Sequence, residues 1–351
     1  MNLYALGSNG SSQLGLGHAD DLSTPASVRL PRSAAPDVIH KIAAGGNHTL
    51  LLTSSGALLA AGCNVDGRCG LDTCREVEVF TLVDALQTDY ESMTVTFCAA
   101  TWEASILVTA NGAIYTVGSG AKGELGLGPD IQIASTPRIL ASFPPPGTNI
   151  VDLAACMGHV VAVLSNGEVW GWGNGLHGQL GQPAAVAWVP RKVEGIDFKV
   201  VRAVCGKDFT CVFGDLVEGK LAIIGLEKRD RFQLKRQVPN SVPGWKEVQA
   251  TWGGVYVLLS SGELVAWGRN DHGQLPPPRL PPLKSVAAGS EHVVAVTRSA
   301  KILTWGWSEH GNCGDATDER CDVKDRWNEL VVNKECVAVG AGCATSWIVT
   351  S

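Results

Sequence analysis

The sequence predicts an all-β fold, a seven-bladed β-propeller closed by pairing of strands from the two ends of the chain. A glycine-rich motif recurs along the chain with a period near 50 residues, as is typical of propellers and solenoids. Short apolar runs, separated by tight turns, lie between the copies of this motif. After the last copy the pattern continues into the first residues of the chain, so the repeat closes on itself.

The motif consists of a glycine, a short spacer and then Gly-(Gln/Glu)-Leu-Gly. Its copies begin at Gly7 (GSNGSSQLG), Gly62 (GCNVDGRCG), Gly118 (GSGAKGELG), Gly173 (GNGLHGQLG), Gly268 (GRNDHGQLP) and Gly306 (GWSEHGNCG), with an eroded copy at Gly225 (GLEKRDRFQL). The starts are 55, 56, 55, 52, 43 and 38 residues apart, and the step from the last copy round to the first is 52. Glycines at such fixed positions indicate turns that need positive φ.

A unit of three short strands precedes each copy. The clearest runs from Ile42 to Gly62, and the others are Ala99–Gly118, Leu153–Gly173, Val204–Gly225, Val248–Gly268 and Val286–Gly306. Turns of the Ser-Gly or Asn-Gly type predict a hairpin in four of these units, at Gly56, Gly112, Gly167 and Gly262. The strands are rich in Val, Ile, Leu and Ala, as expected when neighbouring blades cover both faces of each sheet.

The two ends of the chain complete each other. Val337–Thr350 supply the turn and an inner strand of a unit, and Leu3–Gly7 supply its missing last strand. One blade built from both termini, which we call the clasp, closes the ring and hides edge strands that would otherwise pair with other molecules. The prediction is one domain over residues 1–351.

Composition limits the function. The 351 residues carry a net charge of -6 with a pI of about 5.8, which argues against a general nucleic-acid binder. None of the 11 cysteines forms a C-x-x-C pair or has zinc-ligand spacing, and Cys98, Cys156, Cys205 and Cys211 lie in apolar runs that predict buried, reduced thiols. No signal peptide or membrane-spanning run is recognisable, so we expect a cytoplasmic and nuclear protein.

Several strings imitate catalytic motifs. Gly118–Gly123 and Gly173–Gly178 fit G-x-G-x-x-G, but no helix follows to receive a pyrophosphate. Gly306–Gly311 approaches a nucleophile elbow without its closing glycine. We therefore predict no enzyme activity, no cofactor and no metal. His48, His159 and His292 occupy equivalent positions in separate blades, where we expect each to bond the turn of its own blade.

The tryptophans suggest a partner-binding face. Trp102 and Trp252 lie in turns before the histidine position, whereas Trp172, Trp267 and Trp305 lie in strand ends that predict core positions; Trp307 and Trp347 flank turns near the clasp. Exposed Trp is enriched at binding hot spots. The predicted face consists of Trp102, Glu103, Lys207, Asp208, Trp252, Glu291, Trp307, Glu309 and His310. The charged segment Glu227–Arg236 is expected to be a surface loop, or else a basic patch that faces a partner.

Together the G-(Q/E)-L-G motifs and the G-x-x-H turns resemble the regulator-of-chromosome-condensation repeat, which implies seven blades of four strands each. A narrower likeness is to the fungal killer-toxin-insensitivity and α-tubulin-suppressor proteins. It is carried by YALGSNGSSQLGLGH (Tyr4–His18), GGNH (Gly45–His48), GKDF (Gly206–Phe209), GSEH (Gly289–His292), WGWSEHGNCG (Trp305–Gly314) and GCATSWIV (Gly342–Val349).

This resemblance implies a non-catalytic partner subunit. The expected partner is a small CSL-type zinc-ribbon protein of diphthamide biosynthesis, a metal-binding electron donor with which it would form a heterodimer. The implied roles are diphthamide formation on elongation factor 2 and Elongator-dependent modification of tRNA wobble uridines.

Other functions of the same family provide alternatives. The first is guanine-nucleotide exchange on a small GTPase, for which the sequence shows no inserted wedge hairpin. A light sensor would need G-W-R-H-T turns, and neither Trp102 nor Trp252 is followed by Arg-His. Chromatin binding is disfavoured by the acidic balance and by the lack of a basic tail.

Overall fold

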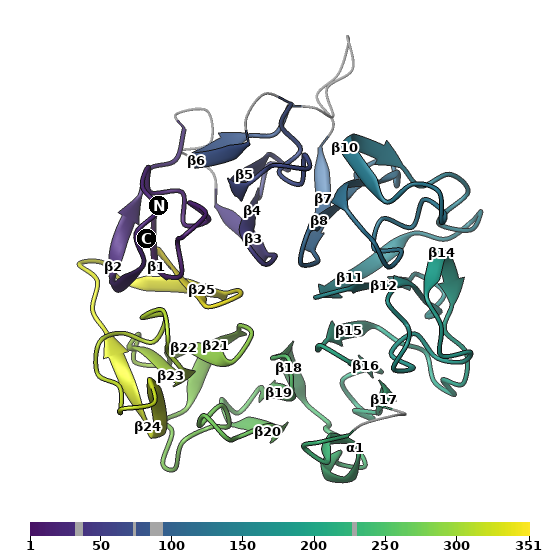
Figure 1. Cartoon of the computed structure of the whole chain (residues 1–351). Helices are drawn as coiled ribbons and strands as arrows, with labels where there is room; N and C mark the ends of the chain where they lie inside the picture. The colour runs from purple at the N-terminus through teal and green to yellow at the C-terminus, as the bar shows by residue number, and fades with distance from the viewer. Residues whose placement is uncertain (32–37, 73–74, 85–93, 227–229) are drawn as a thin grey trace.

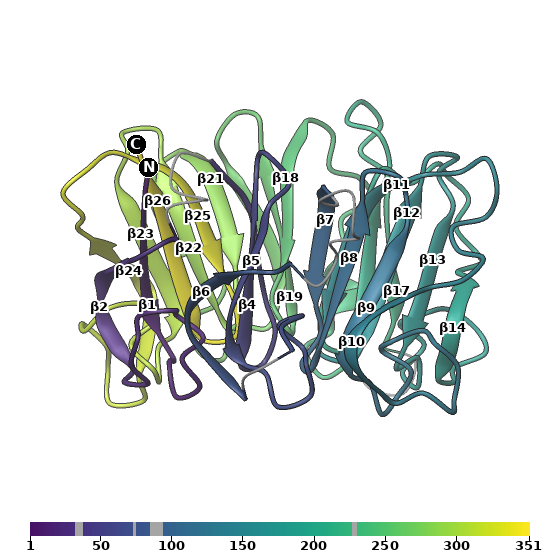
Figure 2. The ribbon, with the colours of Figure 1, turned by 90° about the horizontal axis from the view of Figure 1, so that it is seen from above.

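The computed structural model describes residues 1–31, 38–72, 75–84, 94–226 and 230–351, and within them the chain forms a seven-bladed β-propeller. Figure 1 looks down the ring and Figure 2 shows it from the side. Each blade is an antiparallel sheet whose first strand lies nearest the axis, so the all-β prediction is confirmed. No helix in the described ranges is long and apolar enough to cross a membrane.

The first three blades have four strands each. Blade 1 contains β3 (Ile39–Ala44), β4 (His48–Thr53), β5 (Leu58–Cys63) and β6 (Glu76–Leu82). Blade 2 contains β7 (Val95–Ala100), β8 (Ala104–Thr109), β9 (Ile114–Ser119) and β10 (Ile133–Ile139). Blade 3 contains β11 (Ile150–Cys156), β12 (His159–Leu164), β13 (Val169–Gly173) and β14 (Ala187–Lys192).

The next two blades are narrower. Blade 4 contains β15 (Arg202–Cys205), β16 (Phe209–Phe213) and β17 (Leu221–Gly225), and blade 5 contains β18 (Trp245–Ala250), β19 (Gly254–Leu259) and β20 (Leu264–Gly268). Between them lies the short helix α1 (Leu234–Gln237). Four strands in every blade was therefore wrong for these two within the described residues. The segment after β17 contains α1, and the segment between β20 and β21 is short and contains five prolines, which cannot donate to a strand ladder.

Part of the predicted charged loop is helical. Asp230 accepts hydrogen bonds from the backbone N–H groups of Leu234 (2.7 Å) and Lys235 (3.0 Å), which fixes the start of α1. Leu234 is buried against the core of blades 4 and 5. The expectation of a loop over 227–236 is thus corrected for its last residues, while 227–229 lie outside the described residues.

The two ends of the chain meet in one blade. Blade 6 contains β21 (Leu283–Ala288), β22 (His292–Thr297), β23 (Ile302–Trp307) and β24 (Asp322–Leu330). Blade 7 takes its inner strands β25 (Cys336–Ala341) and β26 (Thr345–Thr350) from the C-terminus and its outer strands β1 (Asn2–Gly7) and β2 (Leu22–Val28) from the N-terminus. Leu3 pairs with Val349, which confirms the clasp; each end contributes two strands, one more than predicted.

Two features explain the sequence pattern. The second strands β4, β8, β12, β22 and β26 are buried along their whole length, so apolar residues without alternation suit them. The glycine that opens each motif ends a third strand with φ near +110°, as at Gly62 (φ 110°) and Gly306 (φ 105°). A Cβ at either glycine would collide with a carbonyl oxygen of the preceding inner turn, so the prediction of positive φ is confirmed.

The three equivalent histidines join neighbouring blades. His48 Nε2 lies 3.0 Å from Ser105 Oγ, His159 Nε2 lies 3.1 Å from Thr210 Oγ1, and His292 Nε2 lies 2.9 Å from Ser346 Oγ. In each case the hydroxyl belongs to the next blade. The expectation that each histidine bonds its own blade's turn was wrong, because the imidazole points across the boundary with the next blade. We call such a boundary between neighbouring blades a seam.

Candidate functional site

One face of the ring carries both the inner turns and the glycine motifs. In each blade the residue after the motif's first glycine donates a backbone hydrogen bond to the inner turn: Cys63 to Asn47 O (2.8 Å), for example, and Trp307 to Glu291 O (2.9 Å). We call this side, which contains all nine residues of the predicted partner face, the turn face.

A belt of backbone hydrogen bonds ties the inner turns to one another around the axis. The N–H of Gly46 donates to Trp102 O (3.0 Å), and the N–H of Trp102 donates to Met157 O (2.7 Å). On the other side of the axis, the backbone N–H of Lys207 donates to Trp252 O (3.0 Å). These bonds join different blades, so they fix the backbone of both tryptophan turns.

Trp102 and Trp252 meet over the axis of the ring. They come from blades 2 and 5, on opposite sides, and their ring centroids lie 6.0 Å apart with planes tilted by 47°. The side chain of Trp102 is 38% exposed, and Trp252 is half-buried with Lys207 Nζ 5.7 Å from its ring centroid. We call these two side chains the Trp pair. Gly46 is needed beside it, since a Cβ there would strike the Trp102 indole.

The Trp pair covers one end of a central channel of about 210 Å³ that the first strands line. Towards the other end, Arg202 Nη1 donates to Asp152 Oδ1 at 2.7 Å. Cys98 and Cys205 lie in the channel wall, and burial raises the pKa of Cys98 to about 12. Both thiols are free and buried, as predicted. Cys211 is also free and buried, and Cys156 is free and partly buried. With its raised pKa, Cys98 stays protonated at neutral pH.

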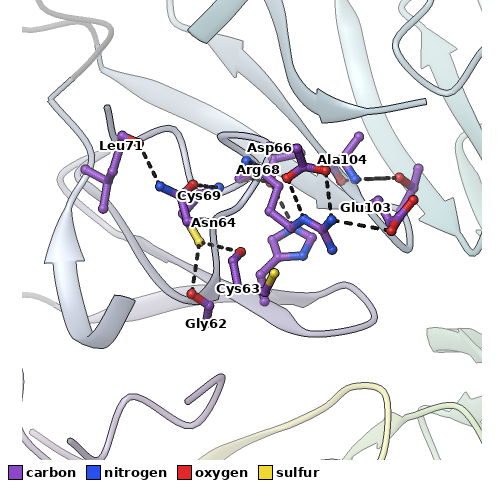
Figure 3. Close-up of polar contacts among 12 residues, drawn as sticks. Gly62, Cys63, Asn64, Asp66, Arg68, Cys69, Leu71, Glu103 and Ala104 are labelled. Carbon is purple, nitrogen blue, oxygen red and sulfur yellow. Dashed lines mark hydrogen bonds and ion pairs between the residues drawn. The ribbon is translucent and has the colours of Figure 1, made fainter. Parts of the chain in front are cut away.

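Glu103 lies beside Trp102 and is bound from the previous blade. Arg68, in the glycine motif of blade 1, forms a 2.7 Å ion pair with Asp66 and lies 3.4 Å from Glu103 (Figure 3). The Arg68 side chain is 5% exposed, whereas that of Glu103 is 49% exposed. Glu103 therefore keeps one side open to solvent at the edge of the Trp pair.

Glu291 occupies the same position in blade 6 but lies beneath the surface. It is 2% exposed, its Oε1 pairs with Arg269 Nη1, and its Oε2 accepts a hydrogen bond from Gln274 Nε2 at 2.7 Å. Burial raises the pKa of Glu291, and the charge of Arg269 opposes that shift. Its carboxylate supports the turn face from below, although the sequence placed it on the surface.

Trp307, Glu309 and His310 lie further from the axis, at and after the end of β23. Trp307 stacks on the His272 ring with centroids 5.1 Å apart, and His310 Nδ1 lies 2.7 Å from Asp21 Oδ2. The predicted face therefore splits into a group around the Trp pair and this outer group. Trp172, Trp267, Trp305 and Trp347 are all buried, which confirms the core prediction for the first three.

Charged and aromatic residues beside Trp252 were not predicted as site residues. Phe232 has two guanidinium groups near its ring, with Arg231 Cζ 5.3 Å and Arg269 Cζ 5.1 Å from the ring centroid. Together with Trp252 they line a pocket of about 270 Å³. The one sequence signal was the phenylalanine inside the charged run, which a purely solvated loop would not need.

Comparison with known proteins agrees with the architecture. The model of the RCC1-like domain matches residues 2–348. An RCC1 repeat-containing protein of Schizosaccharomyces pombe is 31% identical, over 99% of this chain and 98% of that protein. The secretion-regulating guanine nucleotide exchange factor of Mus musculus is 29% identical over 78% of this chain, which spans 61% of it. The crystal structure of Prp20p from Saccharomyces cerevisiae has a TM-score of 0.84 at 24% identity, covering 100% of this chain and 92% of that one, and shows the shared fold.

Proposed function

Because the chain belongs to the RCC1-like domain family, we propose that it is a protein-binding propeller whose turn face docks a small CSL-type zinc-ribbon protein of diphthamide biosynthesis. The observation that carries the proposal is the Trp pair. Two large aromatic side chains from blades 2 and 5 are held together over the axis, partly exposed, on a backbone fixed by bonds between blades. Rigid, partly exposed Trp is characteristic of binding hot spots.

Charges of both signs surround this aromatic centre. Glu103 lies at its edge with half of its side chain exposed, Lys207 covers the Trp252 ring, and Asp208 follows it in the chain. A mixed rim around an apolar centre suits a small folded protein better than a uniformly charged polymer. The choice of a zinc-ribbon partner rests on the sequence likeness of Tyr4–His18 and Trp305–Gly314 to the killer-toxin-insensitivity proteins. The chain would then act in diphthamide formation on elongation factor 2 and in Elongator-dependent tRNA modification.

The test is co-purification with the zinc-ribbon protein of the same organism, followed by size-exclusion chromatography with light scattering. We expect a one-to-one complex that Trp102→Ala and Trp252→Ala each weaken by about 30-fold, the effect of losing a hot-spot side chain of about 2 kcal/mol. Val217→Ala is the matched control, since Val217 is 85% exposed in the β16–β17 loop on the opposite face. A wild-type chain that stays monomeric beside the partner would refute the proposal.

The second candidate is a guanine-nucleotide exchange factor for a small GTPase. It is favoured by the mouse relative that is named as such an exchange factor, at 29% identity over 78% of this chain. Release of a fluorescent GDP analogue from a panel of small GTPases separates the two candidates. Accelerated release at catalytic amounts of the chain supports exchange activity, and release at the intrinsic rate throughout eliminates it.

A further inference from the structure

A pocket of about 270 Å³ opens beside the Trp pair, between blades 4 and 5. Phe209 and Leu234 form its floor, since they line the pocket and are only 1% and 2% exposed, and their side chains make the floor apolar. Its walls include the rings of Phe232 and Trp252. This volume is below the usual range for drug-sized ligands, so it suits one or two side chains better than a cofactor.

Two cations at this pocket have no carboxylate partner. Lys207 lies over the Trp252 ring and Arg231 over the Phe232 ring, at 5.7 Å and 5.3 Å from the centroids. Neither forms an ion pair with any residue in the described ranges, and both are exposed. Arg269, on the same pocket, differs because it pairs with Asp271 and Glu291.

The acids of the pocket, in contrast, are already engaged. Both carboxylate oxygens of Asp230 accept backbone N–H groups at the start of α1, at 2.7 and 3.0 Å. Glu291 is held by Arg269 and Gln274, and Asp208 lies 3.7 Å from His177 Nε2. The three carboxylates of the lining equal its three cations in number, but Lys207 and Arg231 have no ion-pair partner in the described ranges, so their side chains are free to bind an anion of a ligand. An apolar floor beneath two such cations is complementary to an anion on an apolar stem.

We propose that this pocket binds an acidic segment of the partner protein, with an apolar or aromatic side chain on the Phe209–Leu234 floor and a neighbouring carboxylate between Lys207 and Arg231. The inference rests on the proposed function and deepens it, because it names the part of the partner that the turn face recognises. The pocket shares Trp252 with the Trp pair, so both would be covered by one continuous interface.

The first test needs no partner. The probe is the dipeptide N-acetyl-Asp-Phe-amide, titrated to about 10 mM, where affinities of a few kcal/mol are measurable. Its control is N-acetyl-Asn-Phe-amide, of the same shape without the charge, and the readout is the Trp252 indole N–H signal in NMR spectra. We expect the acidic dipeptide to bind about tenfold more tightly than the amide, and Lys207→Gln with Arg231→Gln to remove that difference.

Three outcomes overturn the inference. Equal binding of both dipeptides, or binding of neither, would show that the pocket does not select a carboxylate. Inorganic phosphate is the competitor: if it displaces the acidic dipeptide at equal concentration, the cations form a site for free anions and not for a protein segment.

The second test uses the zinc-ribbon protein. Lys207→Gln with Arg231→Gln should weaken the complex about tenfold, and Lys220→Gln with Arg298→Gln makes the same charge change in loops of the opposite face. If the complex forms but ignores the first pair of substitutions, the inference fails while the proposed function stands. If no complex forms although the acidic dipeptide binds selectively, the choice of partner fails while the pocket's chemistry stands.

Discussion

Acidification should lower the free energy of unfolding of the propeller, because of three histidines that lie where neighbouring blades meet. His48, His159 and His292 are fully buried. Burial lowers the pKa of His48 to about 3, with a further contribution from the charge of Arg68. Burial likewise lowers the pKa of His159 and His292 to about 4.

The hydrogen-bond geometry explains why protonation is unfavourable. Ser105 Oγ donates its single proton to the carbonyl oxygen of Arg68 at 2.6 Å, so it accepts from His48 Nε2–H. An added proton must therefore go to Nδ1, which has no hydrogen-bond partner in the described structure. Thr210 and Ser346 donate in the same way to Gln179 O (2.8 Å) and Asn312 O (2.7 Å), so the other two seams repeat the arrangement.

The direction and size of the effect follow from the pKa values. In the unfolded chain a histidine takes up its proton near pH 6.5, whereas in the ring it stays neutral to about pH 4. The unfolded state then binds more protons, so the free energy of unfolding falls as the pH drops from about 6.5 towards 4. Between pH 8 and pH 5 each histidine lowers the free energy of unfolding by about 2 kcal/mol, and the three together lower it by about 6 kcal/mol. Domain stabilities of about 5–15 kcal/mol make this loss measurable.

Urea unfolding of the wild type at pH 8, 6.5 and 5 measures the effect. The boundary between blades 4 and 5 provides a natural model for a control variant. Phe209 of blade 4 occupies the position of the histidine, and Val255 of blade 5 occupies the position of the hydroxyl residue. His48→Phe with Ser105→Val copies this natural pair and should remove about a third of the pH dependence. His18→Gln, at an exposed histidine, is the control. If the double variant keeps the full wild-type slope between pH 8 and 5, the buried seams do not cause it.

Two further substitutions test single contacts, each by chemical denaturation. Gly306→Ala should cost about 1–3 kcal/mol, since the residue has φ 105° and a Cβ would meet Glu291 O; Gly10→Ala, with no atom within 4 Å of its Cβ, should be almost neutral, and equal costs would contradict the argument. Arg269→Met should cost about 3 kcal/mol at pH 7 because it leaves buried Glu291 unpaired. Lower pH should recover part of that loss, since burial already raises the pKa of Glu291; no recovery, or full stability at pH 7, would show that the pair is unimportant.

The fold was predictable because its signals are local. The first glycine of each motif indicates a φ that other residues rarely adopt, and each apolar run without alternation indicates a second strand that is covered on both faces. The clasp followed from counting the strands at the two ends of the chain. Blades 4 and 5 departed from the prediction where the period shortens, because an outer strand packs at the rim and its absence leaves the inner strands unchanged.

The site was harder to predict because it depends on distances between blades. The sequence placed Trp102 and Trp252 on one face, but 150 residues separate them and no repeat pattern says that their rings meet at 6.0 Å. Glu103 and Glu291 have equivalent positions, yet one is half-exposed and the other buried. Their difference depends on which residue of the previous blade supplies the arginine, Arg68 from one motif position and Arg269 from another.

One contact between blades did leave a mark in the sequence. Wherever a second strand starts with histidine, the second residue of the next blade's second strand is Ser or Thr, as for His48 with Ser105, His159 with Thr210 and His292 with Ser346. Where it starts with Ala104, Phe209 or Gly254, that residue of the next blade is valine. A hydrogen-bond partner stabilises a buried hydroxyl, which explains why the two positions change together at these six boundaries. The boundary between blades 7 and 1 is the exception, because Thr49 follows a strand that starts with Thr345 and its buried hydroxyl has no partner in the described structure. Comparing a repeat with its neighbour, and not only with its own average, would have predicted these seams.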